Sequence, residues 1–231
     1  MKITNLLLPS AALRRSFATA AAVLLAGLSL PAAQANDITI QPGESTSKDS
    51  FVYSFLTGWA FDSASTGAGA AFGTWLSAGA TTSGAHDLVS YLQFDLTDIT
   101  TLGLTGSDIN KAELYVYVES SSSIGFGANP SASYPIGVSA YEVTGSWTES
   151  TVTWATGPAY STLAGSITIN NVGYWTAIDI TSTVQAWVDG TLTNYGVALE
   201  QDSPVASPGG QVVGVFHSSA GLNKPYLKVN Y

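Results

Sequence analysis

The stretch Trp147-Thr-Glu-Ser-Thr-Val-Thr-Trp154 places two tryptophans and one glutamate in a run of hydroxyl-bearing and β-branched residues. It follows Ile136–Val143, in which apolar and polar residues alternate. Residues of these kinds favour a pleated, half-buried surface, so both segments predict β structure. We expect Trp147 and Trp154 to be core residues, and Glu149 to accept hydrogen bonds from backbone or hydroxyl donors.

Segments with similar alternation follow one another after residue 35, separated by clusters of Gly, Ser, Pro and Asn. Many short strands at fairly regular spacing, with turn residues between them, indicate an all-β fold. We predict two antiparallel sheets packed as a jelly-roll-like β-sandwich. The expected strands are Ile38–Gln41, Phe51–Phe55, Phe72–Ser77, Leu88–Asp95, Lys111–Glu119, Ile136–Val143, Thr151–Trp154, Trp175–Ile180, Tyr195–Gln201, Gln211–His217 and Pro225–Tyr231. The expected loops are Asp62–Ala71, Ser120–Ser133 and Asp202–Gly210.

One segment departs from the β pattern. Its apolar residues recur at helical spacing up to Trp187, and Gly190 is well placed to end a helix. Ser182 and Gln185 have the spacing of a capping box. We therefore predict one short helix near residues 182–189, lying across an open end of the sandwich with Trp187 as its plug.

These blocks resemble the DNRLRE-type domain, also described as carbohydrate-binding module family 96. Residues 147–154 match its W-[ST]-E-x-x-V-T-W signature, and residues 179–196 match D-[IV]-T-x-x-V-Q-x-W-x-x-G-x-x-N-x-G. Residues 92–96, 112–118 and 225–229 are similar to the L-x-F-D-L, A-x-L-x-L-Y-V and P-Y-L-x-V strands of that family. The resemblance implies a β-sandwich that binds carbohydrate, and some relatives bind acidic polysaccharide.

The first 35 residues have the features of an export signal peptide. Positive charge precedes the short apolar run Phe17–Leu30, and Ala33-Gln34-Ala35 is a small-residue cleavage site. The adjacent Arg14 and Arg15 also suit the twin-arginine route, so both Sec and Tat export stay open. Cleavage would leave one domain, residues 36–231, without a membrane span. We expect this domain to be secreted, with the cell surface and the periplasm as further locations.

The charge of this domain argues against polyanionic partners. The chain has 7 basic and 16 acidic residues, and three of the basic ones lie in the predicted signal, leaving a formal charge of 4 − 16 = −12. No arginine remains, so binding of nucleic acid, anionic membranes or acidic polysaccharide is disfavoured. A neutral glycan is the expected ligand. The chain also contains no cysteine, which excludes disulfides, thiol nucleophiles and thiolate metal sites.

Aromatic residues supply the candidate ligand contacts. Tyrosines occupy the polar phase of three expected strands, and two tryptophans flank a Gly/Ala-rich loop outside the shared motifs. Aromatic rings stack on the C–H faces of sugars while nearby polar groups bind the hydroxyls. The alternative is that these rings cover a sheet face or lie in the core. The candidates are Tyr91, Tyr115, Tyr117, Tyr141, Trp59 and Trp75.

A structural calcium ion is the one metal that the sequence suggests. Asp95, Asp98 and Asp108 gather around one expected loop, and calcium prefers several oxygen ligands. The alternative is that they are solvated turn residues, since no EF-hand-like spacing is present.

No enzyme is predicted. His86 and His217 have neither a G-x-S-x-G elbow nor a second close-spaced metal ligand. Glu142 and Glu149 are the nearest approach to a carboxylate pair, and their separation across a turn is not defined by the sequence.

Two functions therefore stay open. One is a non-catalytic module that binds extracellular polysaccharide. The other is a structural cell-surface, matrix or filament-forming protein without a glycan ligand, which self-associates through edge strands such as Ile38–Gln41. An exposed row of the candidate aromatic residues favours the first function, and their burial favours the second.

Overall fold

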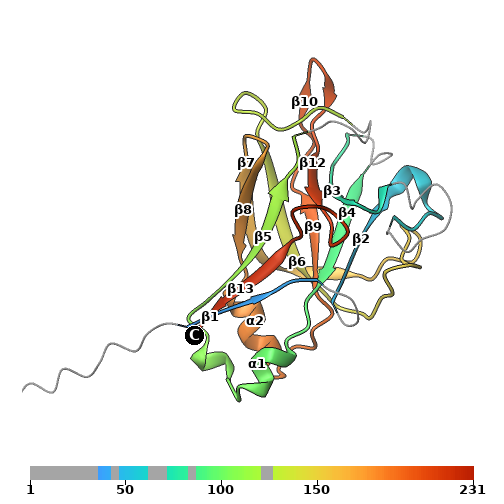
Figure 1. The fold of residues 1–231 in the computed structure, drawn as a ribbon. Coiled ribbons are helices and arrows are strands. Elements are labelled where there is room, and N and C mark those ends of the chain that lie inside the picture. Colours follow the sequence, from blue (N-terminus) through green and yellow to red (C-terminus); the bar gives the residue numbers. More distant parts are fainter. Residues whose placement is uncertain (1–35, 43–46, 62–71, 83–86, 121–126) are drawn as a thin grey trace, which may run out of the picture. The chain divides into compact units, whose positions relative to one another are not determined.

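The computed structural model describes residues 36–42, 47–61, 72–82, 87–120 and 127–231. The predicted signal peptide, the predicted loop Asp62–Ala71 and His86 lie outside these residues. Within them, the predicted all-β sandwich is confirmed: two antiparallel sheets face each other across one hydrophobic core (Figure 1).

The larger sheet has six strands among the described residues, in the order β1-β13-β5-β12-β3, with β8 paired to the other side of β5. These strands are β1 (Asp37–Ile40), β3 (Trp75–Ala78), β5 (Lys111–Val118), β8 (Tyr174–Asp179), β12 (Gly214–His217) and β13 (Tyr226–Asn230). Strand β5 is central because β13 pairs with its first half and β12 meets its end, while β8 follows most of its length.

The smaller sheet has five strands in the described part of the chain, in the order β2-β4-β9-β6-β7. They are β2 (Lys48–Tyr53), β4 (Leu88–Gln93), β9 (Val197–Gln201), β6 (Ile136–Val143) and β7 (Tyr160–Ile169). Two short strands, β10 (Ala206–Ser207) and β11 (Gly210–Gln211), form a hairpin that begins in the predicted loop Asp202–Gly210 and ends one residue beyond it.

The core follows from the two-residue period of the strands. On β5, Leu114 and Val116 point into the sandwich and are buried, whereas Tyr115 and Tyr117 point outward. On β4, Leu92 faces the same core and Tyr91 belongs to a different cluster on the outer side. The alternation predicted for these strands is therefore confirmed.

Helix α2 (Thr181–Val188) confirms the predicted helix, and Trp187 is buried in the sandwich core. Its end is a Schellman motif: Gly190 has φ +69°, its N–H donates to the Trp187 carbonyl, and the Thr191 N–H donates to the Ala186 carbonyl. The predicted capping box is wrong. Gln185 instead donates its amide to the Ile109 carbonyl at 2.9 Å, which ties the helix to a loop.

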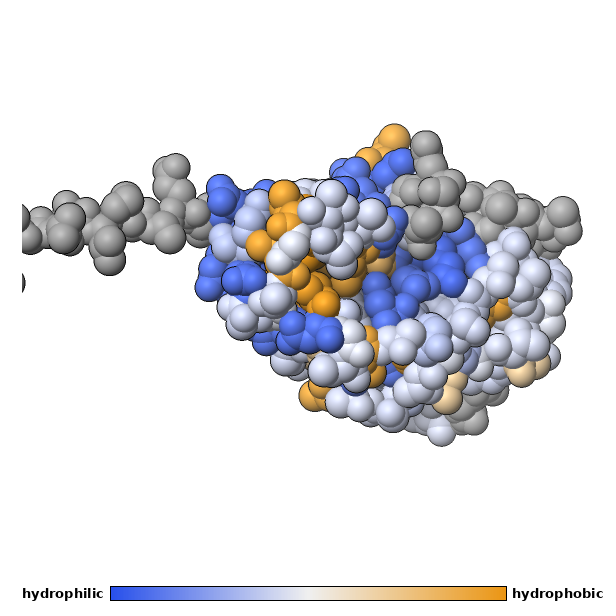
Figure 2. Space-filling view, turned by 90° about the horizontal axis from the view of Figure 1, so that it is seen from below, coloured by the Kyte–Doolittle hydropathy of each residue, from blue (hydrophilic) through white to orange (hydrophobic). Residues whose placement is uncertain are grey.

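Further short helices were not expected from the sequence. They are η1 (Ser54–Leu56), α1 (Thr97–Thr101) and η3 (Gly106–Asp108). Helices α1 and α2 lie at the same end of the sandwich (Figure 1). Figure 2 views the molecule from this end, where hydrophobic residues lie next to a band of hydrophilic ones.

The signature stretch 147–154 forms turns, so the predicted strand Thr151–Trp154 is wrong. The Thr148 carbonyl accepts the N–H groups of both Thr151 and Val152, which is a turn and not a ladder. Trp147 is buried and Trp154 is half-buried. Both pack with Tyr91 on the outer side of the smaller sheet, in a second hydrophobic cluster separate from the sandwich core.

Candidate functional site

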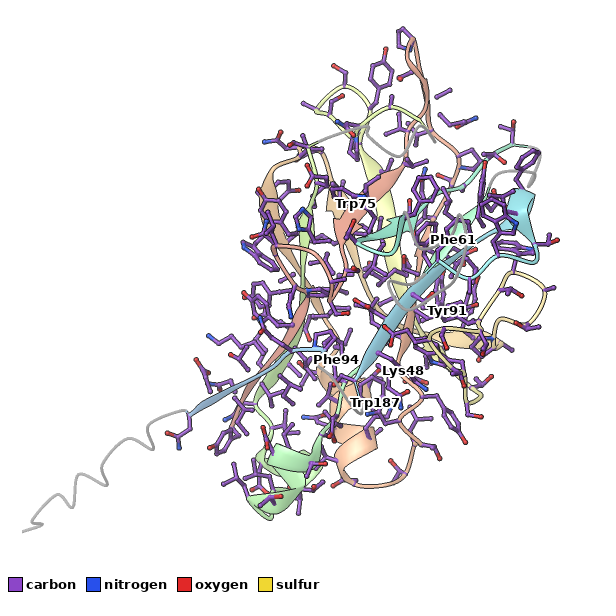
Figure 3. All side chains as sticks on the ribbon, turned by 45° about the vertical axis from the view of Figure 1, so that its right-hand side comes forward. Lys48, Phe61, Trp75, Tyr91, Phe94 and Trp187 are labelled. Atoms are coloured by element: carbon purple, nitrogen blue, oxygen red, sulfur yellow. The ribbon has the colours of Figure 1, made fainter. Side chains whose placement is uncertain are left out.

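The candidate aromatic residues do not share one face, because they belong to different sheets. Tyr115, Tyr117 and Trp75 point outward from the larger sheet. Tyr91 and Tyr141 belong to β4 and β6 of the smaller sheet. Figure 3 labels Trp75 and Tyr91, which lie on these separate sheets.

Strand register aligns four rings across the larger sheet. Trp175 of β8 is opposite Tyr117 of β5, and His217 of β12 is opposite Trp75 of β3. Since Phe216 is opposite Val118, His217 lies next to Tyr117. The ring centroids of Tyr117 are 5.5 Å from Trp175 and 5.2 Å from His217, and Trp75 is 5.2 Å from His217. A row Trp175–Tyr117–His217–Trp75 therefore crosses four strands.

A second, shorter row lies beside the first. Tyr115 of β5 is opposite Tyr226 of β13, and their rings stack at 4.7 Å with an interplanar angle of 7°. The Trp175 ring is 5.0 Å from Tyr226, so the two rows are in contact. We call the six side chains of both rows the aromatic face: Trp175, Tyr117, His217, Trp75, Tyr115 and Tyr226.

Exposure differs along the aromatic face. Trp175 is 38% exposed, the tyrosines and Trp75 are half-buried, and His217 is buried. Sequence reasoning missed Trp175, Tyr226 and His217 as site residues. Trp175 and Tyr226 could have been identified from the sequence, because they alternate with inward-facing residues in strands that the sequence did predict.

Hydrogen bonds fix the orientation of His217. Its Nδ1 accepts the N–H of Asn223 at 3.0 Å, so the ring proton is on Nε2 and is donated to Glu119 at 2.5 Å. This arrangement joins the end of β5 to the segment that follows β12. It also places a carboxylate directly beside the aromatic rows.

The lysines near the aromatic face are already engaged with carboxylates. Lys111 lies 2.6 Å from Glu113, and the hydrogen bond to that carboxylate raises the pKa of Lys111. Lys228 lies 2.8 Å from Asp37, and this hydrogen bond likewise raises its pKa. The Tyr115 hydroxyl donates to Glu113 at 3.2 Å. The face is thus bordered by hydroxyl, carboxylate and ammonium groups, and both of these lysines are paired with carboxylates.

Lys48 serves the signature block instead of a ligand. Its ammonium donates to the Trp147 carbonyl and lies 4.7 Å from the centroid of the Trp147 ring. Burial lowers the pKa of Lys48. Glu149 accepts the Asp49 N–H at 3.1 Å, the kind of structural role expected of it.

The tyrosines of the smaller sheet form a separate, more enclosed group. Tyr91 is 3% exposed and its hydroxyl donates to the Pro158 carbonyl at 3.3 Å. Burial raises the pKa of Tyr91 to about 12. Tyr160 lies 6.2 Å from Tyr91 and 5.8 Å from Tyr141. A sugar ring cannot stack on Tyr91 in this position, so Tyr91 is not part of a ligand-binding surface.

Trp59 is 39% exposed and follows η1. Its ring lies 6.1 Å from Phe61, which stacks on Phe51 at 4.4 Å. Phe51 and Phe61 belong to a third hydrophobic cluster, against which Trp75 also packs. Trp59 therefore does not join the aromatic face directly.

Glu200 on β9 gives a test of the electrostatics of the smaller sheet. Burial raises its pKa, the Tyr160 hydroxyl bond opposes this, and the charges of Asp87 and Asp202 add to the rise. A raised pKa means that the charged form is less favourable in the folded state, so stability is lost as pH rises through that pKa. Glu200→Gln is expected to raise the melting temperature at pH 7, with the gain fading below the ordinary glutamate pKa of 4.5.

Asp108→Asn is the matched contrast for this prediction. The hydroxyl and N–H of Thr105 lower the pKa of Asp108, so its charge stabilises the fold above the ordinary value of 3.8 and this contribution is lost as pH falls. Asp108→Asn should therefore lower the melting temperature at pH 7. Thermal unfolding at pH 7 and at about pH 3, below the ordinary pKa of both groups, checks both variants, and equal shifts of one sign would contradict the argument.

Two of the three candidate calcium ligands accept local hydrogen bonds. Asp95 accepts the N–H and hydroxyl of Thr97 at 2.9 and 2.6 Å, and Asp108 accepts those of Thr105 at 2.8 and 2.7 Å. Asp98 lies in the first turn of α1. Within the described ranges, no group of three or more His, Cys, Asp or Glu side chains is arranged to hold a metal. Calcium binding stays an untested prediction.

No helix of the described residues is long and apolar enough to cross a membrane.

Comparison with known proteins identifies the family. Comparison with curated protein sequences gives no match. The family description of carbohydrate-binding module family 96 matches residues 64–231, which is more than half of the 231 residues. The chain therefore belongs to carbohydrate-binding module family 96.

Proposed function

We propose that this protein is an extracellular, non-catalytic module that binds a neutral polysaccharide on the aromatic face of its larger sheet. The observation that carries the proposal is the continuous set of rings from Trp175 to Trp75, contributed by five strands and bordered by carboxylates. Aromatic rings with adjacent polar groups provide the two kinds of contact that sugars need.

The charges beside these rings favour an uncharged ligand. Outward residues near the two rows include the acids Glu113, Glu119 and Asp179, while Lys111 and Lys228 are paired with acids. A uronate would meet these carboxylates without an arginine to offset them, since residues 36–231 contain none. Neutral sugar hydroxyls can instead donate to the carboxylates.

The structural alternative has less support. Strand β1, the segment considered for donation to another molecule, pairs in its own sheet with β13 from Asp37 to Ile40. Lys228 also pairs with Asp37 across these strands. Light scattering at high concentration checks this alternative: a monomer argues against a filament, and growing assemblies with no glycan binding would favour it.

Trp175→Ala is expected to weaken binding of a neutral polysaccharide about tenfold, equivalent to about 1.4 kcal/mol, because it removes the most exposed ring of the face. Affinity electrophoresis in gels that contain neutral or acidic polysaccharides measures this effect. Leu163→Ala is the matched control, since Leu163 is 56% exposed on β7 of the other sheet. Retardation by acidic polysaccharide alone, or equal weakening by both variants, would overturn the proposal.

A further inference from the structure

We infer that the aromatic face takes one extended chain of a neutral polysaccharide, laid across the strands from Trp175 to Trp75, and not the flat surface of an insoluble polymer. This inference rests on the proposed function and adds the form and direction of the ligand.

The direction follows from the strand register. Trp175, Tyr117, His217 and Trp75 occupy neighbouring strands at the same level of the sheet. Neighbouring strands are about 4.8 Å apart, so the four positions span roughly 14 Å. This strand spacing is close to the length of one sugar unit in an extended β-linked chain. One sugar per strand is therefore the natural match along this row.

The ring orientations exclude a flat platform. Trp175 and Tyr117 meet at 74°, Tyr117 and His217 at 72°, and His217 and Trp75 at 89°. Tyr115 and Tyr226 stack on each other, so the sides of the rings that face each other are not open to a ligand. A protein that binds the flat surface of a crystalline polymer needs several coplanar rings at once. A single chain can turn each sugar to meet a ring face or a ring edge.

Polar groups border the long row on both sides. Glu119 lies one outward position beyond Tyr117 and is held by His217. In the other direction, beyond the row of Tyr115 and Tyr226, Glu113 of β5 is opposite Lys228 of β13. Hydroxyls project from the edges of an extended sugar chain, so acceptors and donors on each side suit a chain that runs along the row. A chain parallel to the strands would pass over the charged residues themselves.

Both ends of the row are bounded, which limits the number of sugar units. Trp75 packs against the cluster that contains Phe51 and Phe61, so a further stacking position is not available beyond it. Trp175 lies on β8, which pairs with β5 on one side and forms the sheet edge on the other. We therefore expect about four sugars to span the face, with Trp175, Tyr117 and Trp75 as the rings open to a sugar, because His217 is buried.

Calorimetric titration of the full chain with cello-, manno- and xylo-oligosaccharides of increasing length tests the inference. Affinity for at least one series is expected to rise about tenfold or more from the disaccharide to the tetrasaccharide and then to level off. Trp175→Ala should remove the gain from the last unit, whereas Leu163→Ala should not. Thermal unfolding of both variants shows that they are folded.

The outcomes separate this inference from the proposed function. Binding that increases up to about four units and then stays constant supports the inference. If the protein binds insoluble cellulose or chitin but no oligosaccharide, the inference is overturned. If Trp175→Ala then loses binding to the insoluble polymer, the proposed function still stands. Affinity that is the same for disaccharide and hexasaccharide also overturns the inference alone. Absence of any neutral glycan binding overturns both.

Discussion

Replacing Trp147 by alanine is expected to lower the free energy of unfolding by about 3–5 kcal/mol, the range for removing a buried large aromatic side chain. Trp147 is 7% exposed, and its ring lies 5.7 Å from Tyr91 in the cluster that covers the smaller sheet. Its indole N–H donates to the Tyr195 carbonyl at 2.9 Å, and Lys48 lies over the ring. Urea unfolding followed by circular dichroism measures the loss.

Two variants show whether the loss comes from packing in this cluster. Trp147→Phe keeps most of the ring but loses the indole hydrogen bond, so we expect a smaller cost, about 1–2 kcal/mol. Trp154→Ala removes a half-buried tryptophan from the same stretch and should also cost less than Trp147→Ala. If both alanine variants unfold at the same urea concentration as the wild-type chain, the signature block does not form a second core.

The signature stretch shows what residue composition does and does not specify. Its aromatic and β-branched residues predicted the burial of Trp147 correctly, because such residues gain most from leaving water, whereas Trp154 is only half-buried. They did not predict a turn, because threonine also stabilises turns through its hydroxyl. Thr156 accepts the Thr153 N–H at 3.0 Å, a local bond that replaces a ladder bond. Composition alone does not decide between these two uses of threonine.

Strand β7 was missed for a related reason. Tyr160–Ile169 is an edge strand with many half-exposed or exposed residues, so it lacks a clear alternation of apolar and polar positions. Its pairing with β6 also changes register near Tyr141. By contrast, Ile136–Val143 was predicted with its observed bounds, because β6 is flanked by β9 and β7 and faces the core.

The aromatic face was only half predictable. Alternation within β5 showed that Tyr115 and Tyr117 share a side, since this is a local property of one strand. It did not show that β8 and β13 lie on either side of β5, which brings Trp175 and Tyr226 to those tyrosines. Strand order depends on pairing between distant segments, and one sequence contains no direct record of it.

Asp49 shows how three such distant segments are joined. It lies on β2 and is 2% exposed, and its N–H donates to Glu149 of the signature block. Its carboxylate accepts the Ser219 N–H at 2.6 Å and the Ser219 hydroxyl at 2.7 Å. The segment after β12, which includes Asn223 and so helps to orient His217, is thereby tied to the opposite sheet. Asp49 is thus a link between the second hydrophobic cluster and the aromatic face.

Asp49→Ala is accordingly expected to lower the free energy of unfolding by about 2–4 kcal/mol, because the half-buried donors of Ser219 lose a charged acceptor that is itself buried. Asp49→Asn keeps one acceptor oxygen and should cost less, and Ser219→Ala, which removes only the hydroxyl, should cost about 1 kcal/mol. Urea unfolding measures all three. An alanine variant as stable as the asparagine variant would contradict the link. Asp49→Ala should also weaken neutral glycan binding if the segment after β12 holds His217 in place, whereas Ser219→Ala, which leaves the N–H bond, should not.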